Sequence, residues 1–575
     1  MQNYSICIIT DIGTIYGFGH ITRMKFIANR LKDNYNFVFS SINNNSDIFK
    51  DSSIKTCQYN EIKKLNPYLI IVDSREVEAK FIKELKTISN VIIIDSVGNE
   101  RAFADIVIEM LPNIDNSKEV NIKPFIATIL NSNIKPKYDE NAPVLLYLGF
   151  NNELKKKAID IIRQIEDKNF VLIDTEKESE YKNISYKNFS PDIFITPYSA
   201  VITYFGLTAF ECIEASIPTV VLSPTKYHDD LAKSQKELFF NLGFFENVNS
   251  NEAASKLKEF LFNKAIQEKY TENGKSINTE KSLERIKTII DNIKDFKDIK
   301  CPFCSSNNIE MKNRNIESNL YKCKKCNTLF RKYFLPPFTD YSSKYFVEDY
   351  KNQYGKTYEE DSKNLSALAK RRLEKIKKIK PKGKILDIGS AMGFFLNEAR
   401  EYGYETEGIE ISEYASNYCV NTLKLNVHNC SLLDFEYKEK EYDIITAWYV
   451  VEHVYNFESI LDKILFSLKD DGILAFATPN GNGLSGKYNK NYFSIVPTDH
   501  AFEANPKSLD ILMSKHSLKC IDLENQSVYY NRFCDIFNLN FIKKNTILSK
   551  IYNSTAKKKN LGDTFECIYI NTKIK

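Results

Sequence analysis

Short apolar runs alternate with polar, helix-like segments along most of this 575-residue chain. Buried parallel strands are continuous runs of Val, Ile and Leu, because helices cover both faces of such a sheet. Strands that alternate with helices therefore predict an α/β fold with parallel sheets. The runs that carry this pattern in the first half of the chain are SICIIT, YNFVFS, YLIIVD, NVIIID, ADIVIE, VLLYLG, NFVLID, AVITYF and PTVVLS.

The spacing of these runs divides the chain into blocks. A chain of this length is expected to hold about three domains. The rhythm breaks near residues 128–143, at LNSNIKPKYDENAP, which is polar and carries two prolines. We expect two α/β lobes joined there, with a ligand cleft between them. The segment SKIYNSTAKKKN near the end is expected to be a solvated basic loop. The predicted domains are a first lobe 1–135, a second lobe 136–290, a cysteine-rich ribbon 300–335, an aromatic helical linker or lid 336–380, a third α/β unit 381–525 and a C-terminal extension 526–575.

Charge and hydropathy argue against some classes of partner. The 79 Lys and Arg residues nearly balance the 75 Asp and Glu residues, which leaves a net charge of +4. The sequence has no basic stripe suited to a phosphate backbone, so we expect no nucleic-acid partner. The start, MQNYSICIITDIG, lacks the basic region and cleavage site of a signal peptide, and no apolar stretch approaches the ~20 residues of a membrane span. We therefore expect a cytoplasmic protein without a membrane span.

Two cysteine pairs give the strongest local signal. Cys301 with Cys304 and Cys323 with Cys326 each form a C-x-x-C knuckle, and two knuckles at this spacing can close a tetrahedral thiolate site on zinc. Because all four positions are sulfur, no position is left for water, and the Zn²⁺ is predicted to be structural. Its role would be to fold a segment too small and polar to fold alone. A redox pair and ordinary buried cysteines are the alternatives.

A glycine-rich turn in KILDIGSAMGFF opens the third α/β unit. It carries Asp387, Gly389 and Gly393 between a predicted strand and a predicted helix. Glycines there let a ligand approach the backbone closely, and the helix N-terminus favours polar or anionic groups. One helix later the strand YETEGIEIS ends in Glu410, an acid suited to hydrogen-bond two ribose hydroxyls. The alternative for Glu410 is a solvated carboxylate at a strand end.

These motifs, followed by NCSLLDF, YDIITAWYVVEHV and DDGILAFATPN, resemble the class I (Rossmann-like) S-adenosylmethionine-dependent methyltransferases over residues 381–525. The resemblance implies that S-adenosyl-L-methionine is the cofactor. The cofactor-binding residues that it implies are Asp387, Gly389, Ser390 and Gly393 beneath the methionine part, Glu410 on the ribose, and Leu433 with Asp434 beside the adenine.

Two histidines of the same unit are candidate catalytic groups. Glu452 and His453 emerge at the carboxyl end of the strand WYVVEHV, where open α/β sheets bind ligands. His453 is a candidate general base that takes a proton from a sugar hydroxyl or an acidic carbon during methyl transfer. His500, in PTDHAFE, belongs to the part of the fold that lines the acceptor side. At both positions a structural histidine is the alternative.

The four-cysteine ribbon, the segment YFVEDYKNQYGKTYEED and the cofactor fold together resemble the zinc-ribbon methyltransferases that act on sugars in glycan and antibiotic pathways. This second resemblance implies a sugar or glycan acceptor. Tyr345, Tyr350 and Tyr354, which lie between the ribbon and the glycine-rich turn, are expected either to line the acceptor pocket or to pack a helical lid.

The N-terminal motif GFGHITR places one of only six histidines between glycines and an arginine. A nicotinamide fingerprint would need an acidic residue at the end of the second strand, which this block lacks. Over residues 1–290 the pattern resembles the GT-B-fold nucleotide-sugar hydrolases and transferases, closest to the UDP-sugar hydrolases of the pseudaminic acid and spore-coat polysaccharide type. The matching residues are Asp11, Gly17, Gly19, His20 and Arg23, whereas Ile9 stands where that family usually has arginine.

The second lobe carries the other half of this resemblance in TYFGLTAFECIEASIPTVVLS. Its turn is expected to present the backbone N–H groups of Gly206, Leu207 and Thr208 at a helix N-terminus, which suits a diphosphate. The resemblance implies that Glu211, one turn into the helix, holds the ribose. We therefore expect a UDP-linked sugar or glycan as the substrate of this block.

Together the resemblances predict a bifunctional enzyme of surface-glycan or nucleotide-sugar metabolism. His20 is a candidate to activate water against a nucleotide-linked sugar, or to orient the sugar for another acceptor, with Asp73 as a second polar group on that face. One alternative is a methyltransferase fused to a catalytically inactive sugar-nucleotide-binding module. Another is a methyltransferase that its ribbon directs to RNA or protein, although the near-neutral charge counts against RNA.

Overall fold

The computed structural model describes residues 4–10, 19–41, 55–75, 77–112, 120–123, 137–149, 151–175, 179–188, 196–275, 277–335 and 342–572. The chain divides into two compact units, Met1–Lys297 and Asp298–Lys575. None of the helices in the described ranges has the length and apolar content that a bilayer span requires.

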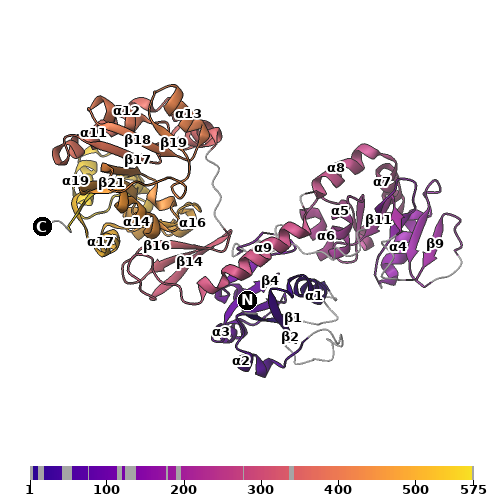
Figure 1. Ribbon diagram of the computed structural model, residues 1–575. Helices are drawn as coiled ribbons and strands as arrows, with labels where there is room; N and C mark the ends of the chain where they lie inside the picture. Colours follow the sequence, from indigo (N-terminus) through magenta and orange to yellow (C-terminus); the bar gives the residue numbers. More distant parts are fainter. Residues whose placement is uncertain are drawn as a thin grey trace. The chain divides into compact units, whose positions relative to one another are not determined.

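The first unit begins with a five-stranded sheet in the order β2-β1-β3-β4-β5, and all its strand pairs are parallel (Figure 1). The central strands β3 and β4 are buried at every residue, as expected for strands with helices on both faces. The elements are β1 (Tyr4–Thr10), α1 (Gly19–Leu31), β2 (Tyr35–Ser41), α2 (Ile62–Leu65), β3 (Leu69–Asp73), α3 (Ala79–Lys86), β4 (Asn90–Ile94) and β5 (Ile106–Ile108).

A second parallel sheet in the same unit has the order β13-β12-β11-β7-β8-β9. The sequence pattern did not indicate β9 and β13, because these edge strands lack the continuous apolar run of the central ones. The elements are β6 (Lys137–Tyr138), β7 (Val144–Leu146), α4 (Asn152–Ile162), β8 (Phe170–Ile173), β9 (Ile184–Lys187), β10 (Pro197–Tyr198), β11 (Ala200–Thr203), α5 (Leu207–Glu214), β12 (Thr219–Ser223), α6 (Lys226–Ser234), β13 (Phe240–Phe244), α7 (Ser250–Phe262), α8 (Lys264–Gly274) and α9 (Thr279–Asn292), with β6 and β10 forming a separate parallel pair.

The end of α9 and the turn η6 (Ile293–Phe296) return to the first sheet. Asn90 at the start of β4 donates through Nδ2 to the carbonyl of Ile293 at 2.9 Å, and the Tyr68 hydroxyl donates to the carbonyl of Ile290 at 3.1 Å. The Tyr35 hydroxyl donates to the Asp291 carboxylate. These contacts place the last helix of the unit against its first sheet.

The second unit is built around a seven-stranded sheet in the order β19-β18-β17-β20-β21-β24-β23, parallel from β19 to β21 and antiparallel at β24. Helices α11, α12 and α13 cover one face and α14 and α17 the other (Figure 1). The elements are α10 (Tyr350–Tyr354), α11 (Ser362–Ile379), β17 (Lys384–Ile388), α12 (Phe394–Glu401), β18 (Glu405–Glu410), α13 (Glu413–Asn421), β19 (Val427–Asn429), β20 (Tyr442–Trp448), α14 (Phe457–Ser467), β21 (Leu468–Pro479), α15 (Leu484–Tyr488), α16 (Tyr492–Ile495), α17 (Pro506–Lys515) and β23 (Leu518–Gln526).

The cysteine ribbon joins this unit through a shared sheet and a shared core. Its antiparallel strands β14 (Ile309–Asn315), β15 (Ser318–Cys323) and β16 (Leu329–Tyr333) continue into β22 (Phe502–Glu503) of the third α/β unit. One hydrophobic core contains three of the ribbon cysteines together with residues of α14 and α17. The ribbon therefore packs into the unit that follows it.

The C-terminal residues differ from the sequence prediction of a solvated basic loop, which is wrong. The structure has α18 (Tyr530–Ile536), the turn η9 (Asn540–Ile542), α19 (Thr546–Lys558) and β24 (Thr564–Asn571). Strand β24 lies between β21 and β23, and Phe565 and Cys567 in it are buried. The apolar run CIYI, residues 567–570, is the local signal that was present. The predicted fold class is confirmed: the chain is an α/β protein with parallel sheets.

Candidate functional site

The glycine-rich turn lies between β17 and α12, as predicted, and its backbone explains its sequence. Gly389 and Gly393 have φ of +68° and +77°. A Cβ at Gly389 would lie 2.5 Å from Cγ2 of Val450, and one at Gly393 would lie 2.8 Å from Sγ of Cys419. Both positions therefore require glycine for conformation and for packing.

Two buried acids border this loop. Glu410, at the end of β18, accepts from the N–H of Ala391 at 2.7 Å and from the N–H of Ser412 at 2.8 Å. Asp387, in β17, accepts from the Thr446 hydroxyl at 2.6 Å. Burial raises the pKa of both, and that of Asp387 to about 7. The solvated alternative for Glu410 is excluded, because it is 6% exposed.

The other predicted cofactor residues surround the same turn. Ser390 is buried beside Gly389, whereas Leu433 and Asp434 are exposed in the loop after β19, where the Ser431 hydroxyl donates to Asp434 at 2.6 Å. The chemistry of the set fits S-adenosylmethionine: buried carboxylates accept from its amino and hydroxyl groups, and a positive-φ turn admits it to the backbone.

The predicted lid segment packs onto this turn. Tyr345 and Tyr350 lie in consecutive helical turns, and the Tyr350 hydroxyl donates to Asp361 at 2.8 Å. Between them Phe346 is buried in a cluster with Met392 of the glycine turn and Ala415 of α13. Tyr354 ends α10. The segment therefore packs against the glycine turn, and its role as a lid or as part of the acceptor pocket stays a prediction.

Two histidines with carboxylate partners lie together at the carboxyl end of β20. His453 Nδ1 is 3.2 Å from Asp499 Oδ2, and His500 Nδ1 is 3.2 Å from Glu503 Oε1. The two imidazole rings are 4.8 Å apart and nearly perpendicular. The side chain of Glu452 is 1% exposed and offers an oxygen within 4.8 Å of both imidazoles. This arrangement can hold a proton or a divalent cation.

The electrostatics favour a base at His453. Burial alone lowers the pKa of His453, but its hydrogen bond to Asp499 and the charge of Glu452 raise it above the ordinary value. The sequence pattern predicted both histidines but not Asp499 and Glu503, although the local pattern DHAFE contains both acids.

The ribbon strand β16 holds the loop that carries His500. Arg331 donates through Nη2 to the carbonyls of Val496 at 2.9 Å and Pro497 at 3.0 Å, and the Tyr333 hydroxyl donates to the carbonyl of Thr498 at 3.0 Å. The N–H of Arg331 donates to the carbonyl of Ala501 at 2.8 Å. The ribbon is therefore a support of the candidate acceptor site.

The four cysteines come together as their spacing predicts. The Sγ atoms of Cys301 and Cys326, and those of Cys304 and Cys323, are 3.5 Å apart, and all four lie within 4.8 Å of one another. Zinc–sulfur bonds of about 2.3 Å in a tetrahedron place sulfurs nearly 4 Å apart, so the set fits Zn²⁺. These residues would hold a structural ion that joins the two knuckles.

In the first unit, His20 lies beside a buried charge network. His20 Nδ1 is 2.6 Å from Asp73 Oδ1, and Arg23 donates to Asp73 Oδ2 through Nε at 2.8 Å and to Asp95 through Nη1 at 2.6 Å. Burial would raise the pKa of Asp73, but Arg23 and then His20 lower it to about 2. Arg23 is 3% exposed, so water screens its charge little and this charge stabilises the Asp73 carboxylate. The sequence analysis missed Asp95.

The remaining predicted residues of this unit divide between described and undescribed positions. Gly19 begins α1, whereas Asp11 and Gly17 lie outside the described residues. Gly206 precedes α5, and Leu207, Thr208 and Glu211 lie in its first turns, each half-exposed. The first N–H groups of α5 have no partner within the helix and are positioned for an anion.

His228, at the start of α6, is a residue that the sequence analysis missed. The Thr225 hydroxyl oxygen lies 2.7 Å from His228 Nδ1, and the His228 ring meets the Tyr204 ring edge-on at 5.9 Å. Burial and then the charge of Arg75 lower the pKa of His228. Its position directly after β12, at the carboxyl edge of the sheet, was the available signal.

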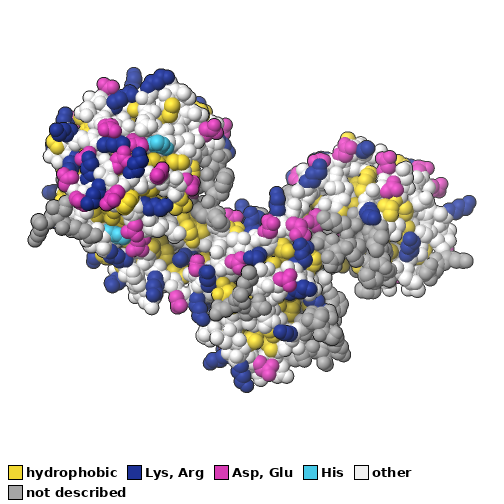
Figure 2. Space-filling model, in the orientation of Figure 1, with side chains coloured by type: hydrophobic (Ala, Val, Ile, Leu, Met, Phe, Trp, Pro, Cys, Tyr) yellow, Lys and Arg dark blue, Asp and Glu magenta, His cyan; other side chains and the backbone are white. Residues whose placement is uncertain are grey.

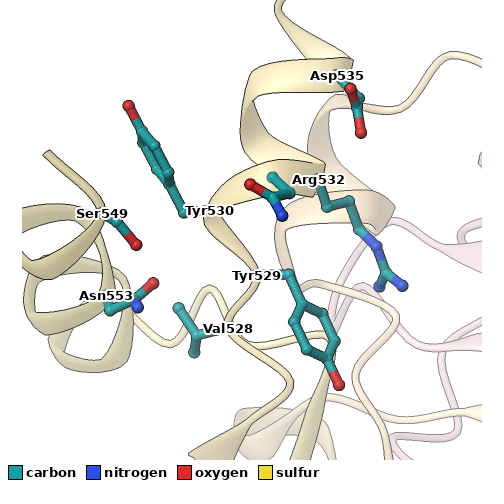
Figure 3. A pocket seen from close by; sticks show the side chains of 8 residues that line it. Val528, Tyr529, Tyr530, Arg532, Asp535, Ser549 and Asn553 are labelled. Atoms are coloured by element: carbon teal, nitrogen blue, oxygen red, sulfur yellow. The ribbon is translucent and has the colours of Figure 1, made fainter. Parts of the chain in front are cut away.

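A pocket of about 480 Å³ lies between α18 and α19, away from every predicted residue (Figure 3). Ser549 and Asn553 reach it from α19, and Tyr530 and Arg532 from α18. Arg532 pairs with Asp563, whose carboxylate also accepts from the N–H and hydroxyl of Ser485 at 2.8 Å. On the face in Figure 2, acidic and basic side chains are interspersed, without a basic stripe.

Comparisons with known proteins indicate a methyltransferase domain in the second unit. A family described as "Methyltransferase domain" matches residues 359–523. A ubiquinone biosynthesis O-methyltransferase of Shewanella halifaxensis is 26% identical over 166 residues, which are 27% of this chain and 70% of that protein.

Among solved structures, a SAM-dependent methyltransferase from Archaeoglobus fulgidus is 20% identical, with a TM-score of 0.30, and the match covers 40% of this chain and 99% of that one. A glycotransferase of kitacinnamycin is 11% identical, with a TM-score of 0.39, over 52% of this chain and 99% of that one. The glycine turn, the buried acids and the family match on residues 359–523 agree. The second unit therefore contains an S-adenosylmethionine-dependent methyltransferase domain.

Proposed function

We propose that this chain is a bifunctional enzyme of nucleotide-sugar or surface-glycan metabolism whose C-terminal domain methylates a sugar or glycan. The observation that carries the proposal is the pair of carboxylate-held histidines, His453 with Asp499 and His500 with Glu503, at the edge of the sheet that bears the cofactor turn. A sugar hydroxyl or an acidic carbon needs such a base, because neither loses its proton readily in water.

The residues divide the reaction between them. S-adenosylmethionine, when bound, supplies an electrophilic methyl group on sulfur. His453 would take the proton that the acceptor atom loses when it is methylated. Asp499 would stabilise the resulting imidazolium, and the turn from Gly389 to Gly393 would hold the cofactor in position. His500, held by Glu503, positions the acceptor.

For the first unit we propose a UDP-linked sugar or glycan as substrate. His20, oriented by Asp73, would activate water or orient the sugar, and Arg23 would keep Asp73 ionised. The N–H groups of Leu207 and Thr208, together with Gly206, would receive the diphosphate and Glu211 the ribose. Asp11, Gly17 and Gly19 complete the proposed set.

The first experiment compares the shift in melting temperature of the intact chain with S-adenosylhomocysteine, UDP or both. Shifts from both ligands, adding together, are expected for two nucleotide sites. A shift from S-adenosylhomocysteine alone would reject the nucleotide-sugar site and leave the methyltransferase. A strongly salt-dependent RNA affinity would favour the RNA alternative instead.

The second experiment separates hydrolysis or transfer from binding. His20→Ala is expected to abolish release or transfer of the sugar from a UDP-sugar while preserving the UDP-induced shift. The matched control is His428→Asn, which changes a half-exposed histidine paired with Glu407 in the other unit. Full release or transfer by His20→Ala would show that His20 is not the catalytic group, and no release or transfer by the native chain would leave the first unit as a binding module.

A further inference from the structure

The structural elements between β23 and β24 contain a strongly basic segment, residues 537–561. It carries six lysines and no Asp or Glu. The proposed methyl transfer uses none of these residues. The lysines are Lys543, Lys544, Lys550, Lys557, Lys558 and Lys559.

The same segment exposes large apolar side chains. Phe541 is 84% exposed and Ile547 is 69% exposed, which makes them the two most exposed large hydrophobic residues in the described part of the chain. Ile551 is 59% exposed, and Phe537 and Leu548 are exposed as well. A run of such residues is unusual on a water-facing helix and marks an interaction surface.

The geometry of α19 places Ile547 and Ile551 on one face. Ser549 and Asn553 line the pocket between α18 and α19, and Ala556 is 1% exposed, so this edge of the helix faces inward (Figure 3). Ile547 and Ile551 are four residues apart and lie on the opposite face. Lys558, seven residues after Ile551, continues that face. The outward face of α19 is therefore apolar and basic.

We propose that this surface, the outward face of α19 with Phe541, binds a lipid bilayer that carries anionic headgroups. An interfacial helix has apolar side chains on one face and lysines around them, and its apolar tips enter the boundary between headgroups and acyl chains. Lysines attract the chain to an anionic surface, and their long stems let the ammonium groups reach the headgroups beside the buried apolar residues.

A bilayer fits this surface better than a soluble acidic partner does. The exposed apolar residues lie on the outward face of α19 and on the turn before it. A soluble polyanion would pair with the lysines while leaving Phe541, Ile547 and Ile551 in water. The nearby pocket does not supply the anion site, because Arg532 is already paired with Asp563. The inference is independent of the methyl acceptor.

The test is co-sedimentation of the full chain with vesicles of phosphatidylcholine alone or of phosphatidylcholine mixed with phosphatidylglycerol, at low and high salt. We expect binding to the mixed vesicles only, weakened by salt. One variant combines Phe541→Ser, Ile547→Ser and Ile551→Ser. Another combines Lys544→Gln, Lys550→Gln and Lys558→Gln. The affinity of this lysine variant for the mixed vesicles should fall on the order of 100-fold, about fivefold for each lysine.

Matched controls change similar residues elsewhere. Phe262→Ser removes a 53% exposed phenylalanine of α7, and Lys256→Gln with Lys264→Gln and Lys269→Gln removes three exposed lysines. These variants should bind the mixed vesicles like the native chain. An unchanged melting shift with S-adenosylhomocysteine shows that the second unit of each variant is folded, and an unchanged melting temperature of the first unit shows the same for the controls.

Three results would overturn the proposal. The first is no binding to the mixed vesicles at low salt. The second is binding that survives the apolar substitutions, which would show adsorption by charge alone. The third is an apolar variant that loses self-association, measured by light scattering, while its vesicle binding stays unchanged. That result would show that the surface is a contact between copies of this chain.

Discussion

Asp499 sets the pH at which His453 carries a proton. Because Asp499 and Glu452 raise the pKa of His453 against the effect of burial, the imidazole stays protonated to a higher pH than usual. As a base it is active only above that pKa. Asp499→Asn should therefore move the acidic limb of kcat/KM for methyl transfer to lower pH, and lower the plateau by about tenfold or more, because the imidazolium loses its partner.

The control for this pH profile is Asp462→Asn, which removes a similar ion pair, 3.1 Å from Nδ1 of His516, outside the proposed site. It should leave the limb in place. An Asp499→Asn enzyme with an unshifted limb would show that His453 is not the titrating base.

The buried carboxyl of Asp387 lowers stability above neutral pH. Its pKa rises from 3.8 to about 7 on burial, so the folded chain holds a proton that the unfolded chain has released, and stability is lost as pH rises from about 4 to 7. Asp387→Asn should stabilise the second unit by up to about 4 kcal/mol at pH 8, and by less at pH 5.

Urea unfolding followed by the fluorescence of Trp448, the single tryptophan of the chain, measures this difference in the second unit. The same variant should lose much of its melting shift with S-adenosylhomocysteine, because the neutral amide attracts the amino group of the cofactor less. If Asp387→Asn stabilises the chain no more at pH 8 than at pH 5, each compared with the native chain at that pH, the raised pKa of Asp387 is contradicted.

At the scale of elements, the ribbon supports the loop before β22. Arg331 and Tyr333 of β16 bond the backbone at residues 496–498, next to Asp499 and His500. Cys323→Ser should therefore remove the metal and lower methyl transfer by about tenfold or more, while the shift with S-adenosylhomocysteine remains, since the glycine turn follows a different strand.

Replacing the zinc with cobalt measures metal binding directly, because a four-thiolate cobalt site has intense charge-transfer absorption. Cys323→Ser should lose this absorption. Arg331→Lys keeps the metal and tests the support alone; it should lower methyl transfer without changing the cobalt spectrum. Cys430→Ser, a half-buried cysteine outside the ribbon, is the control. Full methyl transfer by the metal-free variant would disprove the support.

At the scale of the whole molecule, the division at residue 297 should be a true folding boundary. Each unit has its own sheets and hydrophobic cores, so residues 1–297 and 298–575 should each unfold cooperatively as separate proteins. A chain that ends at residue 525 should instead fail to fold its second unit, because β24, which lies between β21 and β23, would be missing.

Calorimetry of the three truncated chains measures this, with the shift by S-adenosylhomocysteine as a test of the second unit. A cooperative transition in the chain that ends at residue 525 would show that β24 is dispensable. The sequence predicts a domain boundary at residue 525, directly before the elements that complete the sheet. The chain that ends at residue 525 therefore tests this boundary.

The sequence by itself determined the parallel α/β class, the glycine turn, the cysteine knuckles and the motifs that carry His20 and His453. These features are local: apolar runs, positive-φ positions and short ligand spacings act within a few residues of one another. Only the tertiary structure decided other partners, such as Asp95, which is 72 residues from Arg23, and the ribbon strand that holds the His500 loop. It also decided that β24 enters the sheet between β21 and β23. Such contacts depend on which surfaces the packed sheets bring together, and a local pattern does not encode them.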